Sequence, residues 1–114
     1  GDGTESRCFC YVSDIIKAIL TIMDSESGKN EIFNIGNPHE DTINEMIRVL
    51  EKIHGKQILP EYKKFDKPGT KRRVPDITKL NKLGYTPVVT LEEGLKKTYE
   101  WYSNYHKTNS WKLG

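Results

Sequence analysis

The sequence predicts an α/β fold, because three segments with the apolar spacing of amphipathic helices alternate with short runs that favour extended backbone. Two of these helices are also expected to begin at a capping box, in which Thr is followed three residues later by Glu. The chain has 114 residues, which is enough for one domain at most. Its content of Ile, Leu, Val and Phe predicts a globular chain with a modest core.

The first predicted elements are a strand, a helix and a second strand. Aromatic and β-branched side chains at 7–12 favour the first strand. Ser13 is expected to cap a helix whose apolar residues continue to Met23. The second strand, at 31–35, is apolar on both faces, which is typical of a parallel sheet covered by helices.

A second helix is predicted to start at the capping box of Thr42 and Glu45 and to stop at Gly55. Residues 57–62 then favour a short strand, and a basic loop follows at 63–73. The remaining predicted elements are a short helix from Pro75 to about Leu83, an extended run at 85–89, a helix from the capping box of Thr90 and Glu93 to about His106, and a polar tail at 107–114. We expect one domain over residues 1–106.

These strands make a small sheet for three amphipathic helices. The apolar faces of the helices therefore need a partner that the sequence does not contain, and we expect exposed apolar surface. The longest apolar stretch is too short for a membrane span, and no secretory leader is visible at the start.

Positive charge is concentrated in one part of the chain. The net charge of +2 is too small to indicate a nucleic-acid partner. Residues 63–82, however, hold eight Lys or Arg and two Asp. This segment is either a site for an anionic partner or a solvated loop.

Three arginines are the best candidates for binding an anion. Arg7 lies at the start of a predicted strand, and Arg72 and Arg73 lie just before a predicted helix N-terminus. Guanidinium forks and the N–H groups of a helix N-terminus together suit a diphosphate. The alternative is that these arginines pair on the surface with Asp14 or Asp76.

The loop after the strand at 31–35 is a second candidate. Ligands in open α/β sheets lie at the carboxyl ends of strands, so Asn37 is well placed to bind a base or a sugar. The sequence Gly-Asn-Pro is equally ordinary turn chemistry.

Catalytic and metal-binding patterns are absent from the sequence. No arrangement of Ser, His and Asp stands out, and the three histidines are too scattered to form a metal site with Cys8 and Cys10. Two reduced thiols in a cytosolic protein are expected. Taken alone, the chain resembles a binding element more than a catalyst.

Five motifs in order resemble the carboxyl-terminal half of NAD-dependent nucleotide-sugar epimerases and dehydratases, the extended short-chain dehydrogenase/reductases. They are Gly-Asp-Gly-Thr-Glu-Ser-Arg-Cys-Phe-Cys-Tyr-Val-Ser-Asp at 1–14, Phe-Asn-Ile-Gly-Asn-Pro at 33–38, Lys-Arg-Arg-Val-Pro-Asp-Ile at 71–77, Leu-Gly-Tyr-Thr-Pro at 83–87 and Thr-Leu-Glu-Glu-Gly-Leu at 90–95. The resemblance spans residues 1 to about 102.

The resemblance implies a role for several residues. Arg7 and Arg73 match family arginines at the nucleotide diphosphate, and Asn37 matches a loop near the nucleotide. Tyr11 and Arg72 lie in the same motifs and are further substrate-binding candidates. The family also implies a nucleotide-diphosphate sugar as substrate, a homodimeric complete enzyme in the cytoplasm, and an amino-terminal Rossmann domain that holds NAD.

This sequence departs from the family at its catalytic motifs. It contains no Gly-x-x-Gly-x-x-Gly phosphate loop and no Tyr-x-x-x-Lys pair. We therefore expect the substrate-binding portion of such an enzyme without most of the Rossmann domain, with no catalytic residue, no metal and no NAD site of its own. The chain alone should be inactive.

The motifs at 7–14 and 71–77 look most like those of UDP-glucuronate decarboxylases, with 4-epimerases and 4,6-dehydratases as alternatives. The rival hypothesis is a non-enzymatic binding module whose basic loop at 63–73 engages RNA or an acidic protein. Few aromatic residues accompany that loop, so the sequence favours no nucleic-acid partner.

Overall fold

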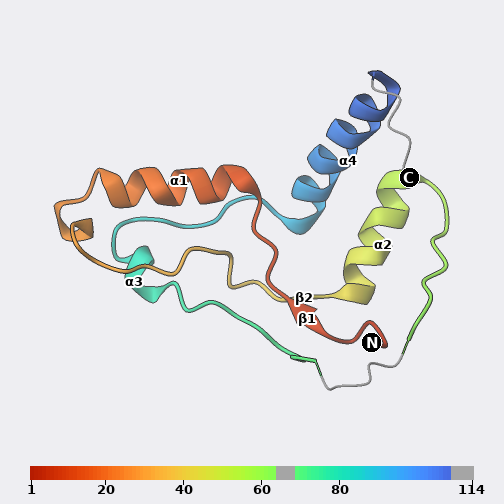
Figure 1. The fold of residues 1–114 in the computed structure, drawn as a ribbon, viewed down its shortest axis with the longest axis horizontal. Helices are drawn as coiled ribbons and strands as arrows, with labels where there is room; N and C mark the ends of the chain where they lie inside the picture. Colours follow the sequence, from red (N-terminus) through yellow and green to blue (C-terminus); the bar gives the residue numbers. More distant parts are fainter. Residues whose placement is uncertain (64–68, 109–114) are drawn as a thin grey trace.

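The computed structural model describes residues 1–63 and 69–108, with helices separated by long extended segments (Figure 1). Part of the basic loop and the end of the predicted tail lie outside the described residues. The elements in chain order are β1 (Ser6–Arg7), α1 (Val12–Met23), the 3-10 helix η1 (Glu26–Gly28), β2 (Asp41–Thr42), α2 (Ile43–His54), α3 (Thr78–Asn81) and α4 (Leu91–Thr108). None of the described helices is long and apolar enough to cross a membrane.

The sheet is smaller than predicted. Strand β1 pairs antiparallel with β2, with Ser6 opposite Thr42 and Arg7 opposite Asp41. The strands predicted at 7–12, 31–35 and 57–62 form no further ladder in the described part of the chain, so the fold is mostly helical. Extended backbone becomes a strand only beside a second strand, and these segments have none to pair with.

The capping signals located two helices well. Thr42 and Glu45 form the capping box of α2, and Gly55 ends that helix in the left-handed conformation, with φ of 74°. Thr90 and Glu93 likewise exchange hydrogen bonds at the start of α4. Helix α4 continues two residues beyond the predicted end, to Thr108.

The other two helices differ from their predicted bounds. Helix α1 begins at Val12 rather than after Ser13, and its N-cap Tyr11 provides no side-chain cap. The Tyr11 carbonyl accepts the N–H of Asp14 instead. Helix α3 has only four residues, and Gly84 follows it with φ of 89°.

The core lies between α1 and the segment around α3. Its fully enclosed apolar residues are Ala18 from α1, with Ile77, Leu80 and Tyr85. Four partly buried side chains pack around this core: Ile22, Phe33, Ile35 and Leu83. The Tyr85 hydroxyl donates to the Gly36 carbonyl at 3.3 Å, and burial raises the pKa of that hydroxyl. The core therefore joins α1, the 33–36 segment and the 77–85 segment.

A buried carboxylate joins α1 to the segment before α4. Asp14 is 2% exposed, and its Oδ2 accepts the backbone N–H groups of Val88 and Val89 at 3.0 and 2.9 Å. Carboxylate acceptors make stronger hydrogen bonds than neutral ones. This interaction fixes where α4 starts relative to α1.

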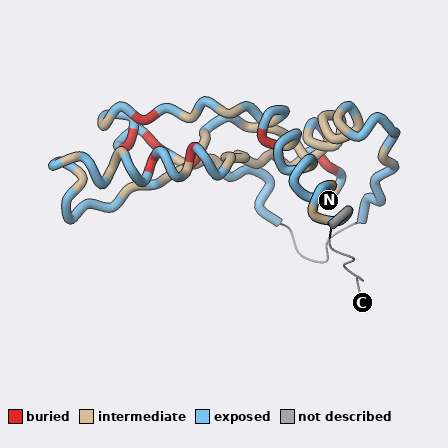
Figure 2. Tube along the Cα trace, turned by 90° about the horizontal axis from the view of Figure 1, so that it is seen from above, coloured by how far each residue is buried: buried red, intermediate tan, exposed pale blue. Residues whose placement is uncertain are grey.

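The chain as a whole is open, as Figure 2 shows by the scarcity of buried residues. The radius of gyration is 17.3 Å, whereas about 13 Å is usual for a compact chain of this length. The accessible surface is 9002 Å², against about 6,400 Å² for a compact protein of this mass. The expectation of exposed apolar surface is confirmed, because large apolar side chains such as Ile16, Leu20 and Met23 are exposed.

Replacing Asp14 should destabilise the fold. Asp14→Ala leaves two N–H groups without an acceptor, and we expect the free energy of unfolding to fall by about 2–4 kcal/mol. Asp14→Asn keeps an acceptor oxygen and should lose about half as much. Urea unfolding followed by circular dichroism measures both, with the exposed Asp24→Ala as control. Equal stability of Asp14→Ala and the control would contradict this role.

Candidate anion-binding site

Strand β1 places Arg7 beside the segment that carries the other two arginines. The Ser6 N–H donates to the Lys71 carbonyl at 3.0 Å. The Nη1 group of Arg7 donates to the carbonyls of Ser6, at 2.6 Å, and Lys71, at 3.4 Å. Nε and Nη2 of Arg7 make no hydrogen bond within the described residues, so two sides of the guanidinium fork are free.

Arg72 is held by an acid that the sequence analysis did not single out. Its Nε and Nη2 donate to both carboxylate oxygens of Glu40 at 2.6–3.0 Å. Ser6 adds a hydroxyl bond to the same carboxylate at 2.8 Å. The hydrogen bonds from Arg72, and then that from Ser6, lower the pKa of Glu40.

The alternative pairing of the arginines with Asp14 or Asp76 is wrong. Asp14 accepts the two backbone bonds described above, and Asp76 accepts the N–H of Thr78 at 2.9 Å. Arg73 is exposed and forms no ion pair or hydrogen bond in the described part of the chain. Its guanidinium is thus available to a ligand.

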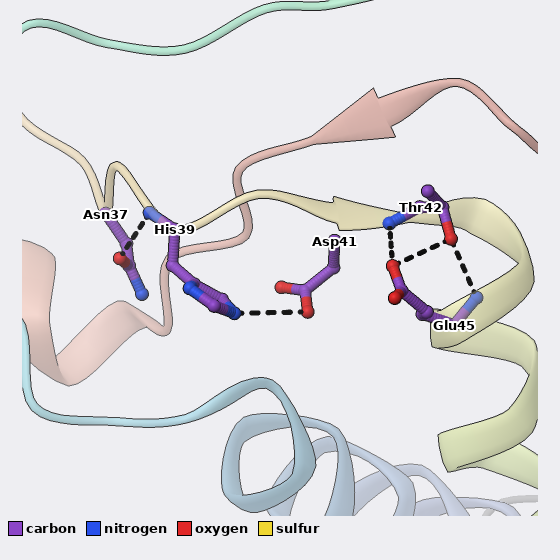
Figure 3. A network of polar contacts seen from close by, with 5 residues as sticks. All are labelled: Asn37, His39, Asp41, Thr42 and Glu45. Atoms are coloured by element: carbon purple, nitrogen blue, oxygen red, sulfur yellow. Dashed lines mark hydrogen bonds and ion pairs between the residues drawn. The ribbon is translucent and has the colours of Figure 1, made fainter.

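Asn37 lies at one end of a row of polar contacts that leads to α2 (Figure 3). Its Oδ1 accepts the backbone N–H of His39 at 3.0 Å, which closes a turn. His39 Nε2 lies 3.5 Å from Asp41 Oδ1, and the capping box of Thr42 and Glu45 comes next. The turn occupies the Asn37 oxygen, while its amide N–H₂ group makes no hydrogen bond to a described residue.

Tyr11 packs on α4. A Cβ atom at Gly94 would lie 3.3 Å from Cδ2 of the Tyr11 ring, so the ring lies close against the backbone of the helix. The Lys97 ammonium lies 5.2 Å from the ring centroid, within cation–π range. In this chain Tyr11 therefore has a packing role between α1 and α4.

Three of the predicted residues line three different hollows of the described chain. Arg7 lines a hollow of about 270 Å³ with Ile47 and Tyr62. Asn37 lines one of about 500 Å³, and Tyr11 one of about 160 Å³. The structure brings Arg7 and the backbone of residue 71 together and places Asn37 and Tyr11 in other hollows.

Possible metal ligands and the two cysteines lie among the described residues. No group of three His, Cys, Asp or Glu side chains is placed to hold a metal ion there. Cys8 and Cys10 are free, and burial raises the pKa of each thiol. The sequence contains no glycine-rich phosphate loop of the kind that binds a dinucleotide.

The sequence did not predict the contacts that two acids make in the fold. Glu40 lies in a segment expected to be a plain loop, 32 residues away from the arginine that it binds. The sequence analysis considered Asp14 as a possible surface partner of the arginines and not as a buried acceptor. No local signal identifies either role, because both depend on segments that meet only in the fold.

Comparison with known proteins adds the family context. Residues 1–36 match the NAD dependent epimerase/dehydratase family. UDP-glucuronic acid decarboxylase 1 of Danio rerio is 40% identical over 108 residues, which cover 90% of this chain and 24% of that protein. This chain is related to the NAD-dependent epimerases and dehydratases.

Two other relatives carry different enzyme names. A probable GDP-L-fucose synthase of Oryza sativa subsp. japonica is 34% identical, covering 90% of this chain and 31% of that protein. The Bacillus cereus UDP-glucuronic acid 4-epimerase, solved with UDP-glucuronic acid and NAD, has a TM-score of 0.83 and 32% identity. The match covers 92% of this chain and 34% of that one. The chain thus spans between a quarter and about a third of these relatives.

The link between Arg72 and Glu40 predicts a shifted titration. We expect the Glu40 carboxyl to titrate below 4.5, its ordinary value, because two arginine nitrogens bind the ionised form. Arg72→Gln should return the pKa toward 4.5. Carboxyl-detected NMR titration of the unsubstituted chain and of the variant measures both. An unshifted Glu40 in the unsubstituted chain would show that the pair does not form in solution.

Proposed function

We propose that this chain supplies the nucleotide-sugar-binding part of an NAD-dependent enzyme that acts on a nucleotide-diphosphate sugar. The observation that carries the proposal is the contact between β1 and Lys71, which brings Arg7 next to the segment of Arg73. The relatives are named as decarboxylases, 4-epimerases and fucose synthases, and one was solved with UDP-glucuronic acid.

Arg7 and Arg73 are the proposed diphosphate ligands. Each has guanidinium N–H groups that make no bond within the described chain, and a diphosphate accepts such groups from two sides. Arg72 is a weaker candidate, because Glu40 occupies two of its nitrogens. Asn37 would contact the nucleotide or the sugar through its free amide N–H₂ group.

NAD and the reacting groups belong, in this proposal, to polypeptide outside the 114 residues. The chain lacks the phosphate loop and the Tyr-x-x-x-Lys pair, and it spans about a third of the Bacillus cereus enzyme. When bound, NAD supplies hydride transfer to and from the sugar. This chain's residues bind and orient the nucleotide, and the complete enzyme is proposed to be a homodimer. Among the candidate reactions, decarboxylation of UDP-glucuronate remains our first choice.

The arginine proposal predicts a graded loss of binding. UDP added to the ¹⁵N-labelled chain should shift the NMR signals around Arg7 and Arg73. Arg7→Ala or Arg73→Ala should each weaken UDP binding by about ten- to a hundredfold, because each removes charge-assisted hydrogen bonds. Arg→Lys should recover only part of the loss, since an ammonium makes no bidentate contact.

Arg72→Ala is the matched control, because it removes one positive charge next to Arg73 and should cost much less. Equal losses for all three arginines would indicate nonspecific attraction to the basic segment. Shifts confined to other parts of the chain would contradict the proposed site.

A further inference from the structure

One acid lies beside the segment that carries two of the candidate arginines. Glu40 precedes β2, and its two carboxylate oxygens accept hydrogen bonds from Nε and Nη2 of Arg72. This bidentate pair leaves only Nη1 of Arg72 without a hydrogen bond to a described residue. Arg7 and Arg73 make no ion pair within the described part of the chain. Glu40 therefore occupies one of the three guanidinium groups.

The Glu40 carboxylate is held from a second side as well. The Ser6 hydroxyl donates to Glu40 Oε2 at 2.8 Å, and the Ser6 N–H donates to the Lys71 carbonyl. The Glu40 side chain is 29% exposed, whereas that of Arg72 is 68% exposed. Surface ion pairs are usually weak, because ordering two long side chains costs entropy. This pair is bidentate and one partner is fixed by a further hydrogen bond, so it competes with a ligand for Arg72.

The cations that remain available differ in kind. Arg7 and Arg73 keep guanidinium N–H groups that bind no described residue. Lys71 lines a hollow together with Lys63, and an ammonium is a point charge rather than a planar fork. Two guanidinium groups can bind two phosphate groups. A third phosphate group would need the guanidinium that Glu40 occupies.

We propose that Glu40 is a specificity-determining residue, which suits the site to a nucleotide with two phosphate groups rather than three. The inference rests on the proposed function. Specificity is a difference between two affinities, and a site gains it by withholding a contact from the wrong ligand. Glu40 withholds the Arg72 guanidinium in this way. It acts through Arg72 and makes no contact with the ligand itself.

The test compares two ligands on the same 114-residue chain. UDP-glucose and UTP are titrated into the ¹⁵N-labelled chain without divalent cations and at one salt concentration, and NMR shifts give both dissociation constants. In Glu40→Gln, the constant for UTP should fall about tenfold relative to that for UDP-glucose, because the freed Arg72 gains a charge-assisted hydrogen bond to the third phosphate group. A merely structural role would change both constants in proportion and leave their ratio unmoved.

Two further variants identify the cause. Glu40→Gln combined with Arg72→Gln keeps the net charge and frees no guanidinium, so the ratio should stay within about twofold of its original value. Glu26→Gln in η1, at the other end of α1 from β1 (Figure 1), removes the same charge as Glu40→Gln. It should also leave the ratio within about twofold, because salt screens distant exposed charges. Circular dichroism checks that each variant keeps its helices.

The outcomes separate this inference from the proposed function. A ratio that Glu40→Gln leaves unchanged, or an equal fall in the double variant, would overturn the inference alone. If Glu40→Gln does not fold, Glu40→Asp keeps the charge but loosens the bidentate contact, and the ratio should fall about threefold. An unmoved ratio in that variant would equally overturn the inference. Absence of UDP-glucose binding to the unsubstituted chain would overturn the proposed function, and the inference with it.

Discussion

Helix α1 carries apolar side chains on two sides, and the chain supplies a packing partner for only one of them. The side with Ala18 and Ile22 gathers the whole core, which joins the extended segment at 33–36 to the segment around α3. The other side stays in solvent. The same shortage of packing partners goes with the open shape, the small sheet and the unpaired strand-like segments. Exposed apolar surface is unfavourable in water, so this side of α1 is the least stable feature of the chain.

Within that open frame, a few polar contacts set the positions of the candidate ligands. Asp14 anchors the start of α4 through Val88 and Val89, and Glu40 binds the guanidinium of Arg72. Strand β1 then brings Arg7 to the Lys71 carbonyl. Arg7 thus lies beside the segment that leads to Arg72 and Arg73, whereas Asn37 and Tyr11 lie in separate hollows.

Local chemistry explains which features the sequence could predict. Capping boxes and apolar periodicity depend on residues a few positions apart, so α2 and α4 were located almost to the residue. The segments at 31–35 and 57–62 have the composition of strands, yet a strand also needs a neighbour, and composition does not reveal whether one exists. The pairing of Glu40 with Arg72 and the buried role of Asp14 likewise depend on tertiary contacts. The family resemblance, carried by short motifs, agreed with the match at residues 1–36 and with the related enzymes.

Hydrogen exchange provides the most direct test of the claim that this chain is one side of a larger structure. In the chain alone, the amides of residues 32–35 should exchange at nearly the rate of an unfolded peptide, while those in the middle of α2 are protected. When the chain is joined to the NAD-binding polypeptide that the proposed function requires, the amides of residues 32–35 should become protected. The exchange of the α2 amides should change little. Strong protection of residues 32–35 in the isolated, monomeric chain would contradict the account.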